Sequence, residues 1–292
     1  MAIEEICEKI IDETNAVRAK YQADYAGDPD AELLAWLQIA VQREAMVCYL
    51  YNEATRNKRL AESEGEVVEV TRDALTLIWQ QEQSHAAELA ARLIDGVFMD
   101  RKGSLDAAFL KIRGTLDATM LDLLTQDRGG VLSVFAKAAT WVAAKFAPNI
   151  VPAFATELPR ANLRGFFVLA RALEQTARDS YARIGQILPA IVLKSSSLQP
   201  QGLLKPIRNT ELDELFHQRV FGEMASWLDS DGAFVAGLEA KTCLRKLREI
   251  LVTTTGIQQY RGRAVPMVYT DGGLGDLFAK HNIKIEVERA AA

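Results

Sequence analysis

The sequence is poor in several features that would narrow its function. It has three cysteines, Cys7, Cys48 and Cys243, which lie far apart and without the spacing of a metal-binding or redox pair. It has eight prolines in 292 residues and no low-complexity tract, so it can bury one large core or two modest ones. Nothing at the N-terminus is typical of a signal peptide, and we therefore expect a cytoplasmic location.

An excess of positive charge and a long apolar run are also missing. The formal net charge of −5 argues against a surface built to hold nucleic acid. The most apolar stretch, 131–155, is interrupted by Lys137, Lys145 and Pro152, whereas a bilayer-spanning helix needs about 20 apolar residues in a row. We expect neither a nucleic-acid partner nor a membrane-spanning helix.

Helical periodicity runs from Ile3 to about Tyr260. Apolar residues recur there at steps of three and four, and alternating β-branched runs are almost absent, so the predicted fold class is all-α. The predicted helices cover about 3–25, 31–59, 65–95, 104–125, 130–146, 160–188, 211–229 and 233–254. Turns are expected at Asp28-Pro29-Asp30 and at Ser63-Glu64-Gly65.

Two segments are predicted to be non-helical. Pro200 and Pro206 argue against a continuous helix there, and Thr210 is a plausible N-cap, so 189–209 is expected to return as an extended segment. After Gly256 we expect short extended pieces at 265–269 and 283–287 around a glycine-rich turn at 272–275. Residues 261–292 are therefore predicted to form a short irregular appendage packed on a helical domain of residues 1–260.

Two of the three histidines stand three residues after a glutamate, as Glu82-Gln-Ser-His85 and Glu214-Leu-Phe-His217. Residues at i and i+3 share one face of a helix, so each pair can offer a carboxylate oxygen and an imidazole nitrogen to one ion. Iron, manganese and zinc all accept this combination of ligands. The two motifs predict metal binding.

Each motif also has a glutamate about one helix earlier, in an otherwise apolar helix. Glu44 precedes Glu82 by 38 residues, and Glu174 precedes Glu214 by 40. A four-helix di-metal site takes one glutamate from each of two helices and a Glu-x-x-His from each of the other two. The midpoint of the first pair is residue 63, in the predicted turn. The midpoint of the second pair is residue 194, but a helix beginning near Thr210 makes that half less symmetric.

This order of motifs, over about residues 31–229, resembles the ferritin-like di-iron carboxylate superfamily, which includes ribonucleotide reductase small subunits, bacterial multicomponent monooxygenases, rubrerythrins and ferritins. The resemblance implies a ferritin-like four-helix bundle with additional helices. It also implies six metal ligands, namely Glu44, Glu82, His85, Glu174, Glu214 and His217. Glu82 and Glu214 would bridge two ions, each histidine would bind one, and Glu44 and Glu174 would be terminal or flexible ligands at the catalytic face.

The resemblance extends to residues behind the ligands. Asp213 completes the superfamily's Asp-Glu-x-x-His pattern and would hold the imidazole of His85 in its ligating tautomer. Gln81 takes the equivalent place in the first motif, where its neutral amide departs from the pattern. Arg178 and Tyr181, one and two turns after Glu174, could reach a substrate or simply cap the site.

The resemblance implies two iron ions, with Fe/Fe expected ahead of Mn/Fe or Mn/Mn, and O2 as a reactant. An oxygenase or oxidase acting on a small organic substrate competes with a radical-generating subunit and with a ferroxidase or storage protein. The radical subunits carry a tyrosine four residues after the first ligand histidine, where this chain has Leu89. The 89 residues from His85 to Glu174 leave room for two more helices, an insertion more typical of oxygenases and radical subunits than of storage proteins.

We therefore predict an oxygenase or oxidase. Hydroxylation would require a ferredoxin or flavin reductase as electron donor, since the chain has no flavin or nicotinamide motif. A non-enzymatic helical scaffold stays open as an alternative, and the oligomeric state stays open between a monomer and a homodimer.

Overall fold

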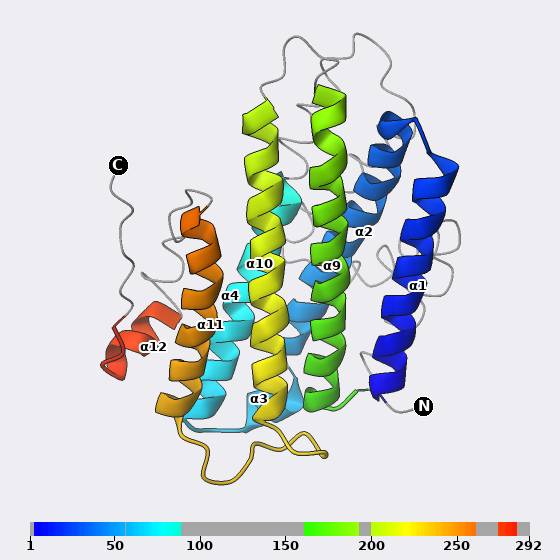
Figure 1. Ribbon diagram of the computed structural model, residues 1–292. Coiled ribbons are helices and arrows are strands. Elements are labelled where there is room, and N and C mark those ends of the chain that lie inside the picture. Colours follow the sequence, from blue (N-terminus) through cyan, green and yellow to red (C-terminus); the bar gives the residue numbers. More distant parts are fainter. Residues whose placement is uncertain (1–2, 56, 89–160, 193–199, 261–273, 285–292) are drawn as a thin grey trace.

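The structure, a computed structural model, describes residues 3–55, 57–88, 161–192, 200–260 and 274–284 (Figure 1). Within these ranges it contains eight helices and no strand, which confirms the all-α class. The predicted helices at 104–125 and 130–146 lie outside the described residues. None of the described helices is long and apolar enough to cross a membrane.

Four long helices form the centre of the molecule: α2 (Pro29–Thr55), α4 (Glu66–Glu88), α9 (Leu163–Val192) and α10 (Pro200–Ser226). α9 packs along α10, α2 packs against both α4 and α9, and α4 contacts α10, so the four helices close into a ring of neighbours. α2 and α4 run in opposite directions, as do α9 and α10 (Figure 1). The arrangement is two antiparallel hairpins laid side by side.

Burial of one face explains why these segments stay helical. In α9 the side chains of Phe167, Ala170, Tyr181, Ile184 and Leu188 are fully buried, and they recur at helical spacing. Each large apolar side chain buried in this way contributes about 1.5–3 kcal/mol relative to exposure. The two hairpins are therefore held by a common apolar core.

The remaining helices cover this core. α1 (Ile3–Asp24) packs mainly on α9, α11 (Ala240–Tyr260) packs on α10 and α4, and α12 (Leu274–Lys280) packs on α4. The prediction of an irregular tail is wrong for 274–280, because Leu274, Leu277 and Phe278 bury one face of a short helix against the core. The predicted extended piece at 265–269 and most of the one at 283–287 lie outside the described residues.

The turn of the first hairpin is where the sequence places it. α2 ends at Thr55, and α3 (Lys58–Glu62) follows after Asn57, whose side chain accepts a 2.9 Å hydrogen bond from the N–H of Arg59. This cap is why the predicted continuous helix 31–59 is wrong in its last turn. Ser63 ends α3, and Gly65 adopts φ +121° before α4 starts. A positive φ of this kind suits glycine.

The turn of the second hairpin corrects two predictions. α9 continues past Pro189 to Val192, and α10 begins at Pro200. Thr210 is therefore buried inside α10 instead of capping it, and within the described residues 189–192 and 200–209 are helical instead of extended. A proline inside a helix, such as Pro206, loses one backbone hydrogen bond and crowds the preceding turn, but burial of Ile207 and Leu212 along the same helix outweighs this cost.

The corrected helix bounds also restore the symmetry of the second hairpin. Residue 194, the midpoint of Glu174 and Glu214, falls in the connection between α9 and α10. Residues equidistant from the turn of an antiparallel hairpin lie at the same height. Glu174 and Glu214 are therefore level with each other, as are Glu44 and Glu82.

Candidate metal centre

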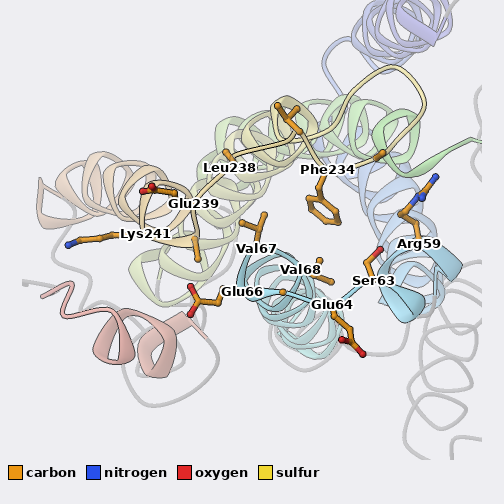
Figure 2. A pocket seen from close by; sticks show the side chains of 14 residues that line it. Arg59, Ser63, Glu64, Glu66, Val67, Val68, Phe234, Leu238, Glu239 and Lys241 are labelled. Atoms are coloured by element: carbon orange, nitrogen blue, oxygen red, sulfur yellow. The ribbon is translucent and has the colours of Figure 1, made fainter.

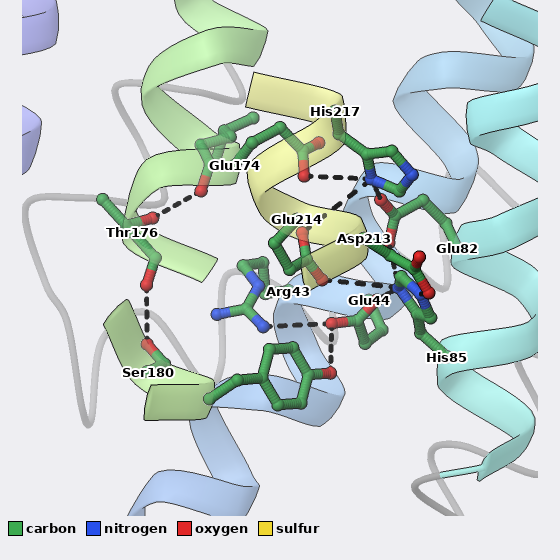
Figure 3. Close-up of polar contacts among 12 residues, drawn as sticks. Arg43, Glu44, Glu82, His85, Glu174, Thr176, Ser180, Asp213, Glu214 and His217 are labelled. Atoms are coloured by element: carbon green, nitrogen blue, oxygen red, sulfur yellow. Dashed lines mark hydrogen bonds and ion pairs between the residues drawn. The ribbon is translucent and has the colours of Figure 1, made fainter. Parts of the chain in front are cut away.

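All six ligands expected from the sequence are buried and meet inside the four-helix ring (Figure 3). α2 supplies Glu44, and α9 supplies Glu174. The other four come in pairs from α4 and α10, as Glu82 with His85 and Glu214 with His217. None is more than 5% exposed. The structure thus brings together all the residues that the two motifs and their preceding glutamates singled out.

The six side chains form two groups that could each hold a metal ion. The first is Glu44, Glu82, His85 and Glu214, and the second is Glu82, Glu174, Glu214 and His217. In each group one potential ligand atom per residue lies within 4.8 Å of the others. Glu82 and Glu214 belong to both groups, so each is placed to bridge two ions.

Both histidines turn Nδ1 toward the carboxylates. Nδ1 of His85 lies 3.3 Å from Oε2 of Glu82 and 3.4 Å from Oε1 of Glu214. Nδ1 of His217 lies 2.7 Å from Oε1 of Glu82 and 3.4 Å from Oε2 of Glu174. The two imidazole rings stack with centroids 5.7 Å apart. Each group therefore has its own histidine.

The outer nitrogens of the imidazoles contact the two residues expected behind the ligands. Nε2 of His85 lies 3.2 Å from Oδ2 of Asp213, and Nε2 of His217 lies 2.9 Å from Oε1 of Gln81. Both oxygens accept, so Nε2 donates its proton and Nδ1 of a neutral ring keeps a lone pair directed into the centre. His85 has an anionic partner and His217 a neutral one.

Several buried polar atoms of this centre have no hydrogen-bond partner among the described residues. They are Oε2 of Glu44, Oε1 of Glu82, both carboxylate oxygens of Glu214 and Nδ1 of His217. Nδ1 of His217 and Oε1 of Glu82 lie 2.7 Å apart, but with the ring proton on Nε2 neither atom can donate to the other. Buried polar atoms are seldom left unpaired, because each then loses the hydrogen bonds that water would give it. Unpaired atoms that converge on one point are what a set of metal ligands looks like without its ions. The residues therefore fit a pair of cations.

The electrostatics point the same way. Burial and the nearby carboxylates raise the pKa of Glu44 and of Glu214 well above the usual value. Burial alone would lower the pKa of both histidines. For His85, the carboxylates of Asp213, Glu214 and Glu82 raise the pKa well above its usual value. For His217, Glu82 and Glu174 raise the pKa to about 10. Burial would raise the pKa of Glu82, but the two histidines lower it well below its usual value. Without metal, the centre must take up protons that cations would replace.

These shifts predict how the stability of the metal-free protein depends on pH. A group whose pKa is higher in the folded than in the unfolded protein stabilises the fold fully at a pH below its unfolded pKa, which is 4.5 for glutamate and 6.5 for histidine. This stabilisation is lost as the pH rises toward the pKa of the folded protein. The pKa of Glu82 is shifted in the opposite direction, so this residue changes the stability only at a pH below about 4.5, outside the range tested. From pH 7 to pH 9 we expect the free energy of unfolding of the metal-free protein to fall by up to about 1.4 kcal/mol per pH unit for each proton, and its Tm to fall with it.

Thermal unfolding followed by circular dichroism at pH 7, 8 and 9 would measure this slope. The chelator-treated protein is compared with the iron-loaded protein, in which bound metal keeps the ligands deprotonated at every pH tested. A metal-free Tm that rises over this range would contradict the assignment of the protons to the centre.

Two tyrosines cross between the hairpins, a feature that the sequence analysis did not predict. The hydroxyl of Tyr51, on α2, donates to Oε1 of Glu174 on α9, and the hydroxyl of Tyr181, on α9, donates to Oε1 of Glu44 on α2 at 2.6 Å. Each tyrosine follows the terminal glutamate of its own hairpin by seven residues, or two helical turns. That repeated spacing was the signal that could have found them. Of the two side chains considered from the sequence, Tyr181 reaches the centre and Arg178 binds Gln218 and Asp179 instead.

Removal of either tyrosine hydroxyl is expected to weaken metal binding about 10- to 100-fold, the usual effect of losing a partner that orients a ligand. Tyr181→Phe should loosen Glu44, and Tyr51→Phe should loosen Glu174. The apparent Fe(II) affinity, measured by competition with a chromophoric chelator, tests this. Tyr25→Phe is the matched control, because Tyr25 lies in the turn after α1 and packs on Tyr21. Equal affinities in all three variants would contradict an orienting role.

A surface groove of about 670 Å³ is separate from this centre (Figure 2). It lies between the turn that precedes α4 and the loop that precedes α11. Its lining includes Arg59, Glu66, Val67, Phe234 and Lys241. Glu66 stands 16 residues before Glu82 on α4, which corresponds to roughly 24 Å along the helix axis. The groove is therefore not an entrance to the ligands.

Comparisons of the chain with protein-family models, with curated proteins and with solved structures gave no match. The assignment of a function therefore rests on the geometry and chemistry of the centre.

Proposed function

We propose that the chain is a ferritin-like protein with a dinuclear non-haem metal centre that reacts with O2 to oxidise a small organic substrate. The observation that carries this proposal is the pair of overlapping groups that share Glu82 and Glu214. Two ions bridged by carboxylates are placed to act together on one molecule, whereas separate sites are not.

We propose two iron ions, with Mn/Fe or Mn/Mn as alternative pairs, because carboxylate and imidazole ligands accept all of these metals. When bound, the pair would supply the electrons that reduce O2. The protein holds the ions through the six ligands and fixes the imidazoles through Asp213 and Gln81. Glu44 has one oxygen held by Tyr181 and the other unpaired. Its unpaired oxygen is the one available to an ion.

Burial of the centre supports an oxidising role. Phe167, Phe221 and Tyr51 form aromatic contacts beside it, with the rings of Tyr51 and Phe221 5.0 Å apart, and all three are fully buried. A dry, apolar surround limits the access of water to reactive species. Cys48, one turn after Glu44, is also fully buried, and burial raises the pKa of its thiol well above the usual value, so it stays protonated.

Exposure of the reduced protein to O2 tests the proposal. The protein is loaded anaerobically with two Fe(II) per chain and then mixed with aerated buffer. We expect O2 uptake that stops once the bound iron is oxidised. If further Fe(II) is instead oxidised in large excess and accumulates as a polymeric ferric core, the protein is a ferroxidase. If the bound iron does not react with O2, the proposed reaction is wrong.

A second candidate function is generation of a tyrosyl radical, and the hydroxyls of Tyr51 and Tyr181 beside the ligands favour it. The position occupied in radical subunits by tyrosine is Leu89, which lies outside the described residues. A sharp tyrosyl EPR signal after exposure to O2, lost in Tyr51→Phe or Tyr181→Phe, would support this function over the oxygenase.

A further inference from the structure

Arg43 places a positive charge against the ligands. Its Nη2 donates to Oε1 of Glu44 at 3.0 Å, the oxygen that also accepts from Tyr181 (Figure 3). The guanidinium carbon lies 4.9 Å from the centroid of the Tyr181 ring. Within the part of the chain that the structure describes, Arg43 is the only buried lysine or arginine. A buried cation beside a metal ligand needs an explanation, because it repels the metal.

The charges of the centre supply that explanation. The described residues contribute five buried carboxylates, those of the four ligand glutamates and of Asp213, and one guanidinium. With neutral imidazoles their formal charge is −4, which equals the charge of two divalent cations with the opposite sign. Without Arg43 the total would be −5, and two divalent ions would leave a net charge in a medium where an uncompensated charge is costly.

The two halves of the centre show where the extra charges lie. The half of the centre that contains His217 has a neutral amide, Gln81, behind the histidine. Its terminal glutamate, Glu174, accepts from Tyr51, and no buried lysine or arginine of the described residues pairs with it. The His85 side has the carboxylate of Asp213 behind its histidine and Arg43 on its terminal glutamate. The guanidinium and the Asp213 carboxylate therefore occur on the same side.

We propose that Arg43 is a positioning and charge-balancing residue of the dinuclear centre: it offsets the carboxylate of Asp213, so that two divalent ions bring the buried centre to zero formal charge. This inference rests on the proposed metal centre. It predicts that Arg43 destabilises the trivalent state of the metals and that Asp213 stabilises it, so each residue sets the reduction potential in the opposite direction.

The competing explanation is that Arg43 only packs on Tyr181 and anchors Glu44. Charge and packing are separated by the replacing side chain. Arg43→Lys keeps the positive charge, whereas Arg43→Met keeps much of the volume and removes the charge. Arg183→Met is the matched control, because Arg183 binds the buried carboxylate of Glu32 through two nitrogens, at 2.7 and 2.9 Å, and not a ligand of the centre.

The test is an electrochemical titration of the iron-loaded protein with soluble mediators, in which each Fe(II) gives one electron to the electrode. For Arg43→Met we expect the equilibrium to shift about tenfold or more toward Fe(III), which lowers the potential by about 59 mV for a one-electron step. Asp213→Asn should shift it in the opposite direction, and the double variant should return near the wild-type value. Arg43→Lys and Arg183→Met should stay close to wild type.

The outcomes separate this proposal from the one on which it rests. Wild-type protein that holds fewer than two irons per chain overturns the dinuclear centre itself. If wild type and variants hold two irons, equal shifts in Arg43→Met and Arg43→Lys, or no shift in Arg43→Met, overturn the charge-balancing role alone. Asp213→Asn provides a second measurement should Arg43→Met fail to fold, and an unchanged potential in that variant also overturns the role.

Discussion

Replacement of Glu214 by glutamine is expected to remove both metal ions and, at the same time, to stabilise the metal-free protein. Glu214 belongs to both ligand groups, and neither of its carboxylate oxygens has a hydrogen-bond partner among the described residues. An amide is a poor metal ligand, so iron content should fall from two per chain to below one. In the metal-free protein the same change removes a carboxyl group whose ionised form is disfavoured by burial and by two neighbouring carboxylates.

The sign of the stability change follows from the raised pKa of Glu214. At pH 7 the Glu214 carboxyl is ionised in the unfolded chain. In the folded, metal-free protein it is either protonated or carries an unfavourable buried charge, and both cost free energy. Glu214→Gln should therefore raise the free energy of unfolding by roughly 0.5–2 kcal/mol. Iron per chain after anaerobic loading and gel filtration measures the first effect, and the Tm of the chelator-treated protein measures the second. Glu69→Gln, on the exposed face of α4, should change neither. Retention of two irons in Glu214→Gln would rule out a bridging role.

Replacement of His217 by alanine should have a different result, in which one ion is lost and one remains. His217 belongs only to the group with Glu174, while the group of Glu44, Glu82, His85 and Glu214 keeps all four residues. We therefore expect about one iron per chain. The oxidised variant should give the EPR signal of an isolated ferric ion instead of the silent pair of a coupled centre.

His85→Ala is the mirror experiment and should also retain one iron. His281→Ala is the control, because His281 is the third histidine of the chain and lies 3.9 Å from Glu66, away from the ligands. Loss of both ions in His217→Ala would show that the two positions do not fill independently. Two ions retained would remove His217 from the ligand set.

The convergence of the ligands could be predicted from the sequence because it depends on simple helical geometry. The i and i+3 spacing of Glu82 and His85 places them on one face, and the midpoint of Glu44 and Glu82 identifies the turn. In the second hairpin the prediction of an extended return is wrong for 189–192 and 200–209, because Pro206 does not break α10. A local preference of this kind gives way when burial along the rest of the helix is large, as it is for α10.

Arg43, Tyr51 and Tyr181 show what the sequence alone did not provide. Their partners are 1, 123 and 137 residues away, and the two long-range contacts depend on how α2 and α9 face each other. The spacing of motifs within each hairpin does not specify the packing between hairpins. Only the equal offset of seven residues from Glu44 to Tyr51 and from Glu174 to Tyr181 indicates that each tyrosine binds the glutamate of the other hairpin.

The crossing of Tyr51 and Tyr181 between the hairpins has a kinetic consequence. Neither hairpin by itself contains a complete ligand group, and each secures the terminal glutamate of the other. Each ion would therefore be held by ligands of both hairpins, so any movement of one hairpin away from the other weakens its coordination. The rate at which a strong chelator removes metal from the protein should then rise in variants that loosen the packing between the hairpins, so the lifetime of the centre depends on the whole bundle.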